Sequence, residues 1–362
     1  MKLPPPRGKK ASIVDVAKLA RVGTTSVTRF INPRKRVELS REVREKIEKA
    51  VKELEYSPRP QARRSRTGKA TYTFGVLTSL SKDIFHSRYH TEILSGIFDR
   101  IAETSHELKF FLLKDRHYER IEEILFEHGL DGMLILTWRI HPNVVRLVEK
   151  SEGDLSLVIF NDYDPKLKVN ILYTDVREGM RQAVIHLLER GYKKIAMLKG
   201  PSHILFRENK KVLRVPSIDA RQKTQGFMDG LKERGIPIQK TKMIRECPSY
   251  LEGDGYHEIR NWIRRNRKAL PEAFVCANDD IAIGALRAIK EAGLSCPKDV
   301  ALVGFDDIEK ARLVSPALTT VKQPLYRMGK DAVDLLIKSI GSPDKSWEHK
   351  PYPPELVVRS TT

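Results

Sequence analysis

The first seventy residues combine a strong positive charge with the spacing of three short helices. Met1 to Ala70 hold 20 lysines and arginines against 7 aspartates and glutamates, a net charge of +13. The whole chain carries +19, so the remaining 292 residues contribute only +6. This asymmetry indicates a polyanion-binding head on a nearly neutral body. A merely solvated basic surface is the alternative, but charge alone does not impose helical spacing.

Start and stop signals divide this head into helices. Ser12 precedes apolar residues at helical spacing, and Asp15 stands three positions later, as in a capping box. Gly23 breaks that pattern, a second helix fits residues 24–31, and Pro33 ends it. Ser40 can begin a third helix, whose apolar stripe is Val43, Ile47, Ala50, Val51 and Leu54. We therefore predict a disordered basic tail over residues 1–10 and an all-α, three-helix, helix-turn-helix head over residues 11–57.

The outer face of the second helix has the chemistry of a DNA-reading surface. Its polar side chains are Thr24, Thr25, Ser26, Thr28 and Arg29. Hydroxyl groups donate or accept at base edges and phosphates, threonine methyls contact thymine methyls, and arginine reaches guanine or phosphate. Isolated residues of these types are usually ordinary solvated positions. Between a capped first helix and a basic third helix, they favour a major-groove contact face.

Two segments of the head carry a family resemblance. They are SIVDVAKLARVGTTSVTRF, residues 12–30, and RPQARRSRTGK, residues 59–69. Both resemble the DNA-binding head and hinge of LacI/GalR-family transcriptional regulators. The resemblance implies that Thr24, Thr25 and Arg29 read bases. Gly23 stands where the family usually has Ser or Thr as a helix cap, and glycine is a tolerable cap.

The hinge departs from the family pattern at one position. By resemblance, residues 58–72 form a hinge helix and linker, and a leucine of the family wedges into the minor groove. Gln61 occupies that position, and an amide cannot supply an apolar wedge. It can hydrogen-bond to minor-groove acceptors instead, so we expect a smaller DNA bend. Arg59, Arg63 and Arg64 supply charge for phosphate contacts.

Beyond residue 73 the chain alternates apolar strands with amphipathic helices. The strand-length runs are Phe74–Leu77, Phe110–Leu113, Met133–Leu136, Leu157–Phe160, Ile195–Leu198, Phe274–Ala277 and Val300–Val303. Continuous apolar strands separated by helices indicate parallel sheets covered on both faces. About 290 residues exceed what a single core usually holds, so we predict two α/β lobes. Ligands of such sheets lie beyond the carboxyl ends of the strands, which places a site between the lobes.

The body also resembles the LacI/GalR family, which has a pair of lobes like those of periplasmic binding proteins, joined by three crossings. The matching segments are AFVCANDDIAIGALRAIKEAG (273–293), VALVGFDD (300–307) and SPALTTVKQPLYRMGKDAVDLL (315–336). The resemblance implies an effector-binding and dimerisation domain over residues 73–362. Lobe one would hold about 73–173 and 325–352, and lobe two about 174–324 and 353–362.

The resemblance implies effector-binding residues one position at a time. Asn278 and Asp306 match residues that bind ligand hydroxyls in the family, and Lys223 replaces a usual arginine. Lysine donates as a point charge and lacks a planar fork, which argues against an ordinary neutral sugar, so we expect a carbohydrate-like or anionic effector. The other candidates are Ser79, Phe85, Asn161 and Tyr250. A structural hydrogen bond or a core contact is the competing explanation for each of them.

Several other classes of protein lack support in the sequence. No apolar run of about 18 residues indicates a membrane span. The three cysteines form no paired spacing, and His86 with His90 lacks a third ligand, so we expect no metal and no cofactor. No nucleophile, zinc or Walker motif supports an enzyme of sugar or nucleic-acid metabolism. We expect a cytoplasmic protein, associated with the nucleoid when bound to its operator.

The favoured interpretation is a dimeric, ligand-responsive transcriptional repressor of double-stranded operator DNA. We expect a dimer, because an apolar heptad tail of the kind that forms tetramers does not follow PELVVRS. One alternative is a catabolite-control type of regulator, with a phosphocarrier protein as co-regulator. Another is a purely architectural DNA binder, against which the polar residues Asn278 and Asp306 argue. The long loop from Ser202 to Asp219 is either a solvated insertion, which we favour, or an edge of the effector site.

Overall fold

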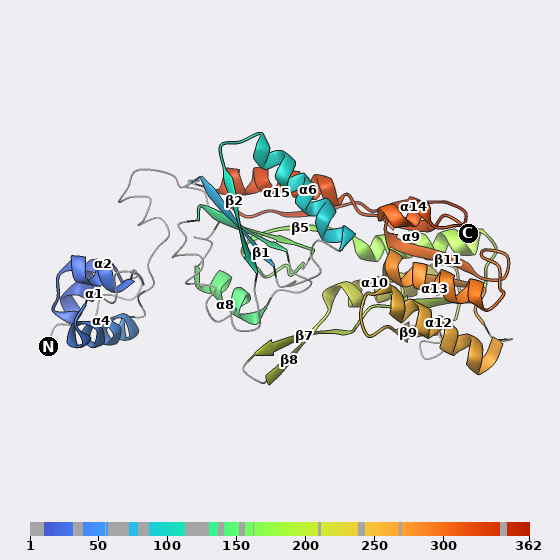
Figure 1. The fold of residues 1–362 in the computed structure, drawn as a ribbon, viewed down its shortest axis with the longest axis horizontal. Helices are drawn as coiled ribbons and strands as arrows, with labels where there is room; N and C mark the ends of the chain where they lie inside the picture. Colours follow the sequence, from blue (N-terminus) through green and yellow to red (C-terminus); the bar gives the residue numbers. More distant parts are fainter. Residues whose placement is uncertain are drawn as a thin grey trace. The chain divides into compact units, whose positions relative to one another are not determined.

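The computed structural model describes residues 11–31, 39–54, 56, 72–78, 87–112, 130–136, 141–151, 156–161, 163–208, 211–237, 243–267, 270–340 and 346–362. This part of the chain forms two compact units, a helical head and an α/β body (Figure 1).

The head consists of α1 (Ile13–Ala20), α2 (Thr24–Ile31) and α4 (Arg41–Glu53). Ser12 and Asp15 form the predicted capping box at the start of α1, with each side chain bonded to the other's backbone N–H. The Ser40 hydroxyl accepts from Val43 N–H at 3.3 Å and caps α4. The head core centres on Val16, Val27 and Ile47, which are fully buried. Three helices around so small a core confirm the prediction from periodicity.

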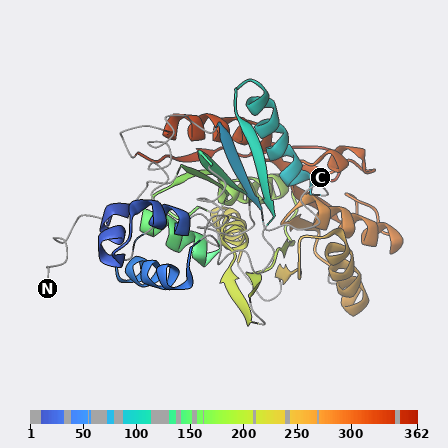
Figure 2. The ribbon, with the colours of Figure 1, turned by 60° about the vertical axis from the view of Figure 1, so that its left-hand side comes forward.

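The first sheet of the body has the strand order β13-β5-β4-β3-β1-β2. Its strands are β1 (Thr73–Thr78), β2 (Glu107–Leu112), β3 (Gly132–Leu136), β4 (Leu157–Phe160), β5 (Asn170–Thr174) and β13 (His349–Tyr352). Helices α6 (Arg88–Ala102) and α15 (Leu325–Ser339) pack together over one face, and α8 (Pro142–Ser151) lies on the other (Figures 1 and 2). Residues on this sheet and its helices are lobe one.

The second sheet has the order β14-β12-β11-β10-β6-β9. Its strands are β6 (Ile195–Lys199), β9 (Ile244–Glu246), β10 (Ala273–Cys276), β11 (Ala301–Asp306), β12 (Thr319–Lys322) and β14 (Glu355–Val357). The side chains alternate between two apolar clusters. One packs on α9 (Val176–Glu189) and α10 (Ile218–Glu233), the other on α12 (Glu252–Asn266) and α13 (Asp279–Glu291). This sheet and its helices are lobe two.

The two lobes exchange the chain three times. The crossings run from β5 to α9, from β12 to α15, and from β13 to β14. The first and third crossings touch, because Asp175 N–H donates to the Tyr352 carbonyl at 3.1 Å. All strand pairs with a recorded direction in these two sheets are parallel except β12 with β14. The predicted two-lobed α/β body with parallel sheets is therefore confirmed, with one antiparallel edge strand.

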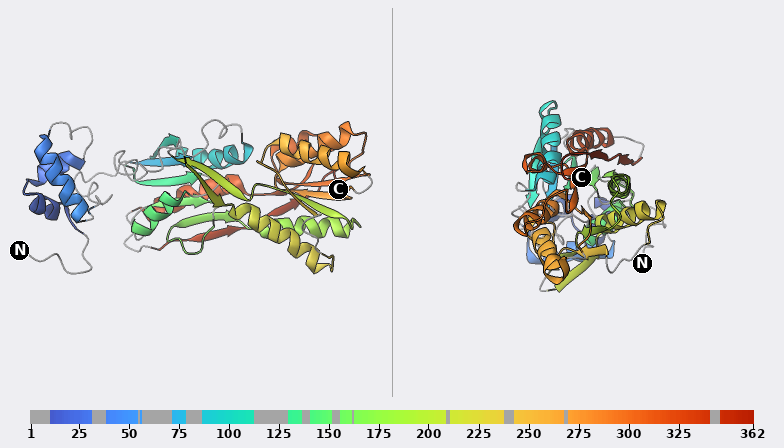
Figure 3. Two further views of the ribbon diagram at one scale, coloured as in Figure 1. Left: turned by 90° about the horizontal axis from the view of Figure 1, so that it is seen from below. Right: turned by 90° about the vertical axis from the view of Figure 1, so that its right-hand side faces the viewer.

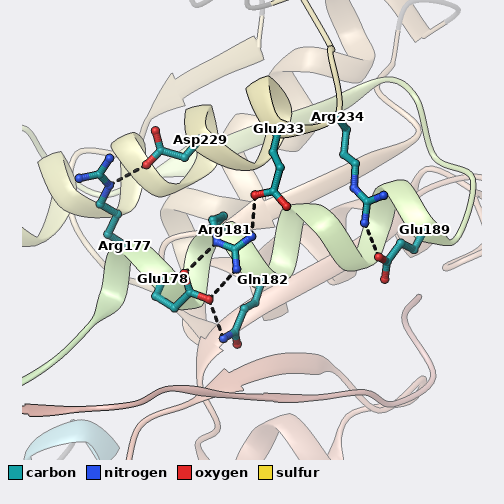
Figure 4. Close-up of polar contacts among 8 residues, drawn as sticks. All are labelled: Arg177, Glu178, Arg181, Gln182, Glu189, Asp229, Glu233 and Arg234. Atoms are coloured by element: carbon teal, nitrogen blue, oxygen red, sulfur yellow. Dashed lines mark hydrogen bonds and ion pairs between the residues drawn. The ribbon is translucent and has the colours of Figure 1, made fainter.

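Helices α9 and α10 approach each other closely at two glycines of α10. A Cβ atom on Gly226 would lie 2.0 Å from the Arg177 carbonyl oxygen, and one on Gly230 would lie 2.8 Å from Val184. Ion pairs flank this contact (Figure 4): Arg177 bonds Asp229 at 2.6 Å, and Arg181 bonds Glu233 at 2.7 Å. The backbone approach therefore depends on glycine, while the charges lie around it.

The long loop between β6 and α10 contains an antiparallel hairpin. It consists of β7 (His203–Glu208) and β8 (Lys211–Pro216), which form a two-stranded sheet of their own (Figure 3). Neither strand is a continuous apolar run, so the search for apolar runs did not predict them. The segment is therefore an ordered element of lobe two.

Candidate functional site

Helix α2 exposes the side chains expected to read DNA. Thr24, Thr25 and Arg29 are exposed, and Thr25 and Arg29 lie four residues apart on one helix face. Ser26 and Thr28 are half-buried. The Thr28 hydroxyl donates to the Thr24 carbonyl at 2.9 Å, so its hydrogen is already engaged. The exposed face of α2 is thus centred on Thr25 and Arg29.

The start of α2 is closed by backbone alone. The Gly23 carbonyl accepts from Ser26 N–H at 2.9 Å and Val27 N–H at 3.3 Å. No atom lies within 4 Å of a Cβ placed on Gly23, so this residue is not required by crowding. The hinge candidates lie outside the described residues: Arg59, Gln61, Arg63 and Arg64.

In lobe two, Asp306 lies on a strained turn at the carboxyl end of β11. Asp306 and Asp307 have φ angles of 111° and 55°, a region that residues with a Cβ rarely adopt. Three contacts hold this turn: Gln323 donates to Asp306 at 2.7 Å, Arg359 pairs with Asp307 at 2.5 Å, and Ile308 N–H donates to buried Asp279 at 2.8 Å. The backbone is therefore held in a costly conformation that presents Asp306.

The Asp306 carboxyl group has an unusual proton affinity. Burial raises its pKa to about 7, against the lowering effects of the Lys223 charge and the Gln323 hydrogen bond. The charges of Asp219 and Asp280 raise it further. A carboxyl group whose pKa lies near neutrality, beside hydrogen-bonding side chains, is typical of a binding site.

Lys223 is buried in an ion pair. It projects from α10, and its Nζ atom lies 3.1 Å from Asp219 and 2.9 Å from the Ala277 carbonyl. The same atom lies 4.2 Å from the centre of the Phe305 ring. The side chain is almost inaccessible, and its charge is balanced locally by Asp219. Lys223 is thus part of the lobe-two framework around Asp306.

Tyr250 and Asn278 are both engaged in this framework. The Tyr250 hydroxyl donates to Asp219 at 3.0 Å, and burial together with the Asp219 charge raises the Tyr250 pKa. Asn278 caps α13 by accepting from Ile281 N–H at 3.0 Å, and it donates to the Tyr250 carbonyl at 3.0 Å. A side-chain amide has two N–H groups and two lone pairs, so the described residues use half of the Asn278 hydrogen-bonding capacity.

In lobe one, Asn161 follows β4 with a φ angle of 53°. Its oxygen accepts from Thr174 N–H at 2.8 Å, and its amide bonds the hydroxyl of Tyr89 on α6. Burial raises the Tyr89 pKa, and the charges of Asp306 and Asp219 raise it as well. Tyr89 therefore lies within electrostatic range of the lobe-two carboxylates. The candidates Ser79 and Phe85 lie outside the described residues.

Two family models match this chain. One for bacterial regulatory proteins of the lacI family matches residues 12–59, and one for a periplasmic binding protein-like domain matches residues 184–362. The HTH-type transcriptional repressor PurR of Vibrio vulnificus strain CMCP6 is 30% identical over 362 residues, covering 97% of this chain and 98% of that relative. The chain belongs to the LacI family of bacterial transcriptional repressors.

Solved structures of LacI-family regulators share the fold. A lac repressor dimer bound to operator and the anti-inducer ONPF is 25% identical, with a TM-score of 0.66 and coverage of 98% of this chain and 99% of that one. A complex of the transcriptional regulator CelR with cellobiose has a TM-score of 0.71 at 24% identity, covering 97% and 100%. The head of this LacI-family protein is therefore a DNA-binding helix-turn-helix domain, as the sequence indicated.

The sequence interpretation missed three residues of the lobe-two and lobe-one framework. Asp219 stands one helical turn before Lys223, a spacing that predicts an ion pair. Gln323 directly follows β12, at the same sheet edge as Asp306. The position of Tyr89 could not be predicted in this way, because its partner Asn161 follows a distant strand and the nearby carboxylates belong to the other lobe.

Within the described ranges, no group of His, Cys, Asp and Glu residues could hold a metal ion. In the same part of the chain, no helix is long and apolar enough to cross a membrane.

Proposed function

We propose that this LacI-family repressor binds an inverted-repeat operator as a dimer, through two α2 helices. We also propose that a neutral, hydroxyl-rich metabolite binds at the carboxyl ends of the lobe-two strands and changes the operator affinity. Two-fold symmetric heads read half-sites one helical turn apart or a multiple of that. The lac repressor, solved as a dimer on its operator, supports this arrangement.

The observation that carries the ligand proposal is an unpaired acceptor on Gln323. Its Nε2 atom donates to Asp306, which fixes the amide orientation, and its Oε1 atom is buried without a hydrogen-bond partner among the described residues. Leaving a buried acceptor unpaired costs about 1–3 kcal/mol. A ligand hydroxyl donating to Gln323 Oε1 would recover this loss, and a second ligand hydroxyl could donate to Asp306.

The charge balance favours a neutral ligand over an anionic one. Asp219 and Asp306 face the cation Lys223, which already donates to Asp219 and to a carbonyl. An anion at this place would meet Asp306 without a free cation among these groups. Sugars fit the pattern of acceptors, and two neighbours in fold were solved with cellobiose and with ribose.

The size of the switch is compatible with such contacts. Reversing a 1:99 population to 99:1 requires a ligand preference of about 5.5 kcal/mol for one arrangement. Hydrogen bonds to charged groups contribute about 1.5–3 kcal/mol each, so two to four of them are enough.

The test measures operator affinity by fluorescence anisotropy with a panel of neutral sugars, including cellobiose and ribose, and of sugar phosphates. We expect a neutral sugar to change wild-type affinity. Asp306→Ala should lose this response and keep operator affinity in its absence, because α2 makes the DNA contacts. The control Glu355→Ala, an exposed acid of the same lobe, should respond as wild type. A full response by Asp306→Ala refutes the site, and a response only to sugar phosphates refutes the neutral ligand.

The phosphocarrier alternative remains a separate prediction. A pull-down with a phosphocarrier protein, in its phosphorylated and unphosphorylated forms, tests it directly. Regulation by a docked protein would persist in the Asp306→Ala variant, whereas regulation by a sugar would not.

A further inference from the structure

The β7–β8 hairpin is an ordered element for which the proposed function has no use. Six cross-strand pairs join its strands, from His203 with Pro216 to Glu208 with Lys211. At its base, Ser217 N–H donates to the Ser202 carbonyl at 2.9 Å. Ser202 also donates to the carboxylate of Glu246, from its N–H at 2.8 Å and its hydroxyl at 2.6 Å. These bonds fix the hairpin to lobe two.

The base of the hairpin is continuous with the candidate ligand framework. Ser217 is the cap of α10, because its hydroxyl accepts from Ala220 N–H at 3.2 Å. The first two turns of α10 carry Asp219 and Lys223. Any displacement of the start of α10 must therefore be shared with the base of the hairpin.

The inner face of the hairpin contacts lobe one through two rings. Phe206 meets His141 edge-on, with ring centres 4.8 Å apart, and the two residues are only 7% and 1% exposed. His141 directly precedes α8, and its Nδ1 atom accepts from Asn143 N–H at 3.1 Å, so the backbone orients its ring. Burial and the Arg146 charge lower the His141 pKa to about 4, which keeps this ring neutral at pH 7.

The outer face of the hairpin has the opposite character. Leu205 and Val212 alternate with the inner residues and are 56% and 57% exposed. A hairpin standing free in solvent would bury neither face. The difference in exposure between the two faces therefore arises because the face that carries Phe206 packs against lobe one.

We propose that the β7–β8 hairpin is a strap between the lobes, anchored at the start of α10 and holding the start of α8 through Phe206 and His141. The lobes cannot change their arrangement without sliding or breaking this ring contact. An edge-on aromatic pair shifts an equilibrium by about 2- to 10-fold. The strap thus biases the protein toward the lobe arrangement in which the rings meet.

Hydrogen–deuterium exchange of the full-length protein tests the strap without any ligand. Phe206→Ala should raise exchange about 2- to 10-fold at Val144 and Val145, whose N–H groups donate to the His141 carbonyl. The matched control Leu205→Ala changes the adjacent residue on the outer face and should exchange as wild type. Wild-type exchange at Val144 and Val145 in Phe206→Ala overturns the proposal.

The reciprocal variant separates a strap from a local packing contact. His141→Leu lies in lobe one, yet it should raise exchange at Ala220 and Arg221, in the first turn of α10. If the effect of His141→Leu stops at β7 and β8, the contact is local and the strap is refuted.

Removal of the hairpin gives a third, independent reading. Ser202 and Ser217 are already hydrogen-bonded, so a two-residue Asn-Gly turn can replace residues 203–216 with little disturbance of lobe two. This variant should match Phe206→Ala at Val144 and Val145. Its operator affinity is not part of this test, so failure of the strap is distinguishable from failure of the proposed function.

Discussion

At the scale of single residues, Asp306 combines backbone strain with a shifted proton affinity. An ordinary aspartate in an unfolded chain has a pKa of about 4, whereas the Asp306 pKa in the folded protein is about 7. Between these values the folded protein holds a proton that the unfolded chain has released. The free energy of unfolding should therefore fall as pH rises from about 4 to about 7, and this contribution should change no further above that range.

The variant Asp306→Asn isolates this contribution, because an amide does not titrate in this range. We expect wild type to lose stability relative to Asp306→Asn between pH 4 and pH 7. Urea unfolding of both proteins across pH 4–9 measures the difference. Parallel stability curves would mean that the folded and unfolded forms of Asp306 titrate alike, contrary to the burial seen here.

Sequence could identify some residues of this framework but not their pairings. Asn278 stands two residues after β10 and Asp306 ends β11, where polar residues at the carboxyl ends of parallel strands meet. The same logic would have reached Gln323 after β12. That Asn278 donates to the Tyr250 carbonyl, or that Lys223 donates to the Ala277 carbonyl, follows only from tertiary packing. Whether these residues bind an effector stays a prediction.

At the scale of elements, the α9–α10 pair allows a comparison of two contributions to stability, close backbone packing at a glycine and a surface ion pair. A Cβ atom at Gly226 would overlap the Arg177 carbonyl of α9, and a helix backbone cannot yield locally. Overpacking of this kind costs about 1–3 kcal/mol and sometimes more. The Arg177 side chain is 52% exposed in its ion pair with Asp229, and such pairs contribute about 0.2–1 kcal/mol.

We therefore expect Gly226→Ala to lower the free energy of unfolding by more than about 2 kcal/mol, and Arg177→Ala by less than about 1 kcal/mol. Guanidinium unfolding of the full chain measures both. Gly253→Ala is the control, because no atom lies within 4 Å of its added Cβ on α12, and it should be neutral or stabilising. Equal losses for Gly226→Ala and Arg177→Ala would show that the helices separate readily.

Strand prediction from apolar runs succeeded only where both faces of a strand are covered. The run Met133–Leu136 lies in β3, at the centre of its sheet. Strand β2 is at the edge, and it begins at Glu107, three residues before the predicted run, because polar residues alternate there. Strands β7 and β8 were missed for the same reason, since each has one exposed face.

At the scale of the whole molecule, the sequence predicted the division into a basic head and a two-lobed body, but it did not predict the sheet topology. Charge asymmetry separated a basic head from a nearly neutral body, and alternation of strands and helices indicated two lobes. The three crossings followed from family resemblance alone. No local pattern shows that β13 joins the first sheet and β14 the second, because they lie only three residues apart.

The concentration of positive charge in the head predicts how operator binding depends on salt. With 20 lysines and arginines in its first seventy residues, the protein should neutralise about 6–10 phosphates, and affinity should fall about 10³–10⁵-fold between 50 and 200 mM salt. Arg29→Ala should reduce the salt slope by about one unit if this exposed side chain binds phosphate. Thr25→Ala should keep the slope, and it should change the preference between operator sequences by about 1–3 kcal/mol of binding free energy. Binding-site selection and salt titrations on the selected duplex measure both effects. Thr25→Ala with unchanged sequence preference and affinity would remove α2 from base reading, and a shallow wild-type slope with uniform coating of DNA would contradict operator recognition altogether.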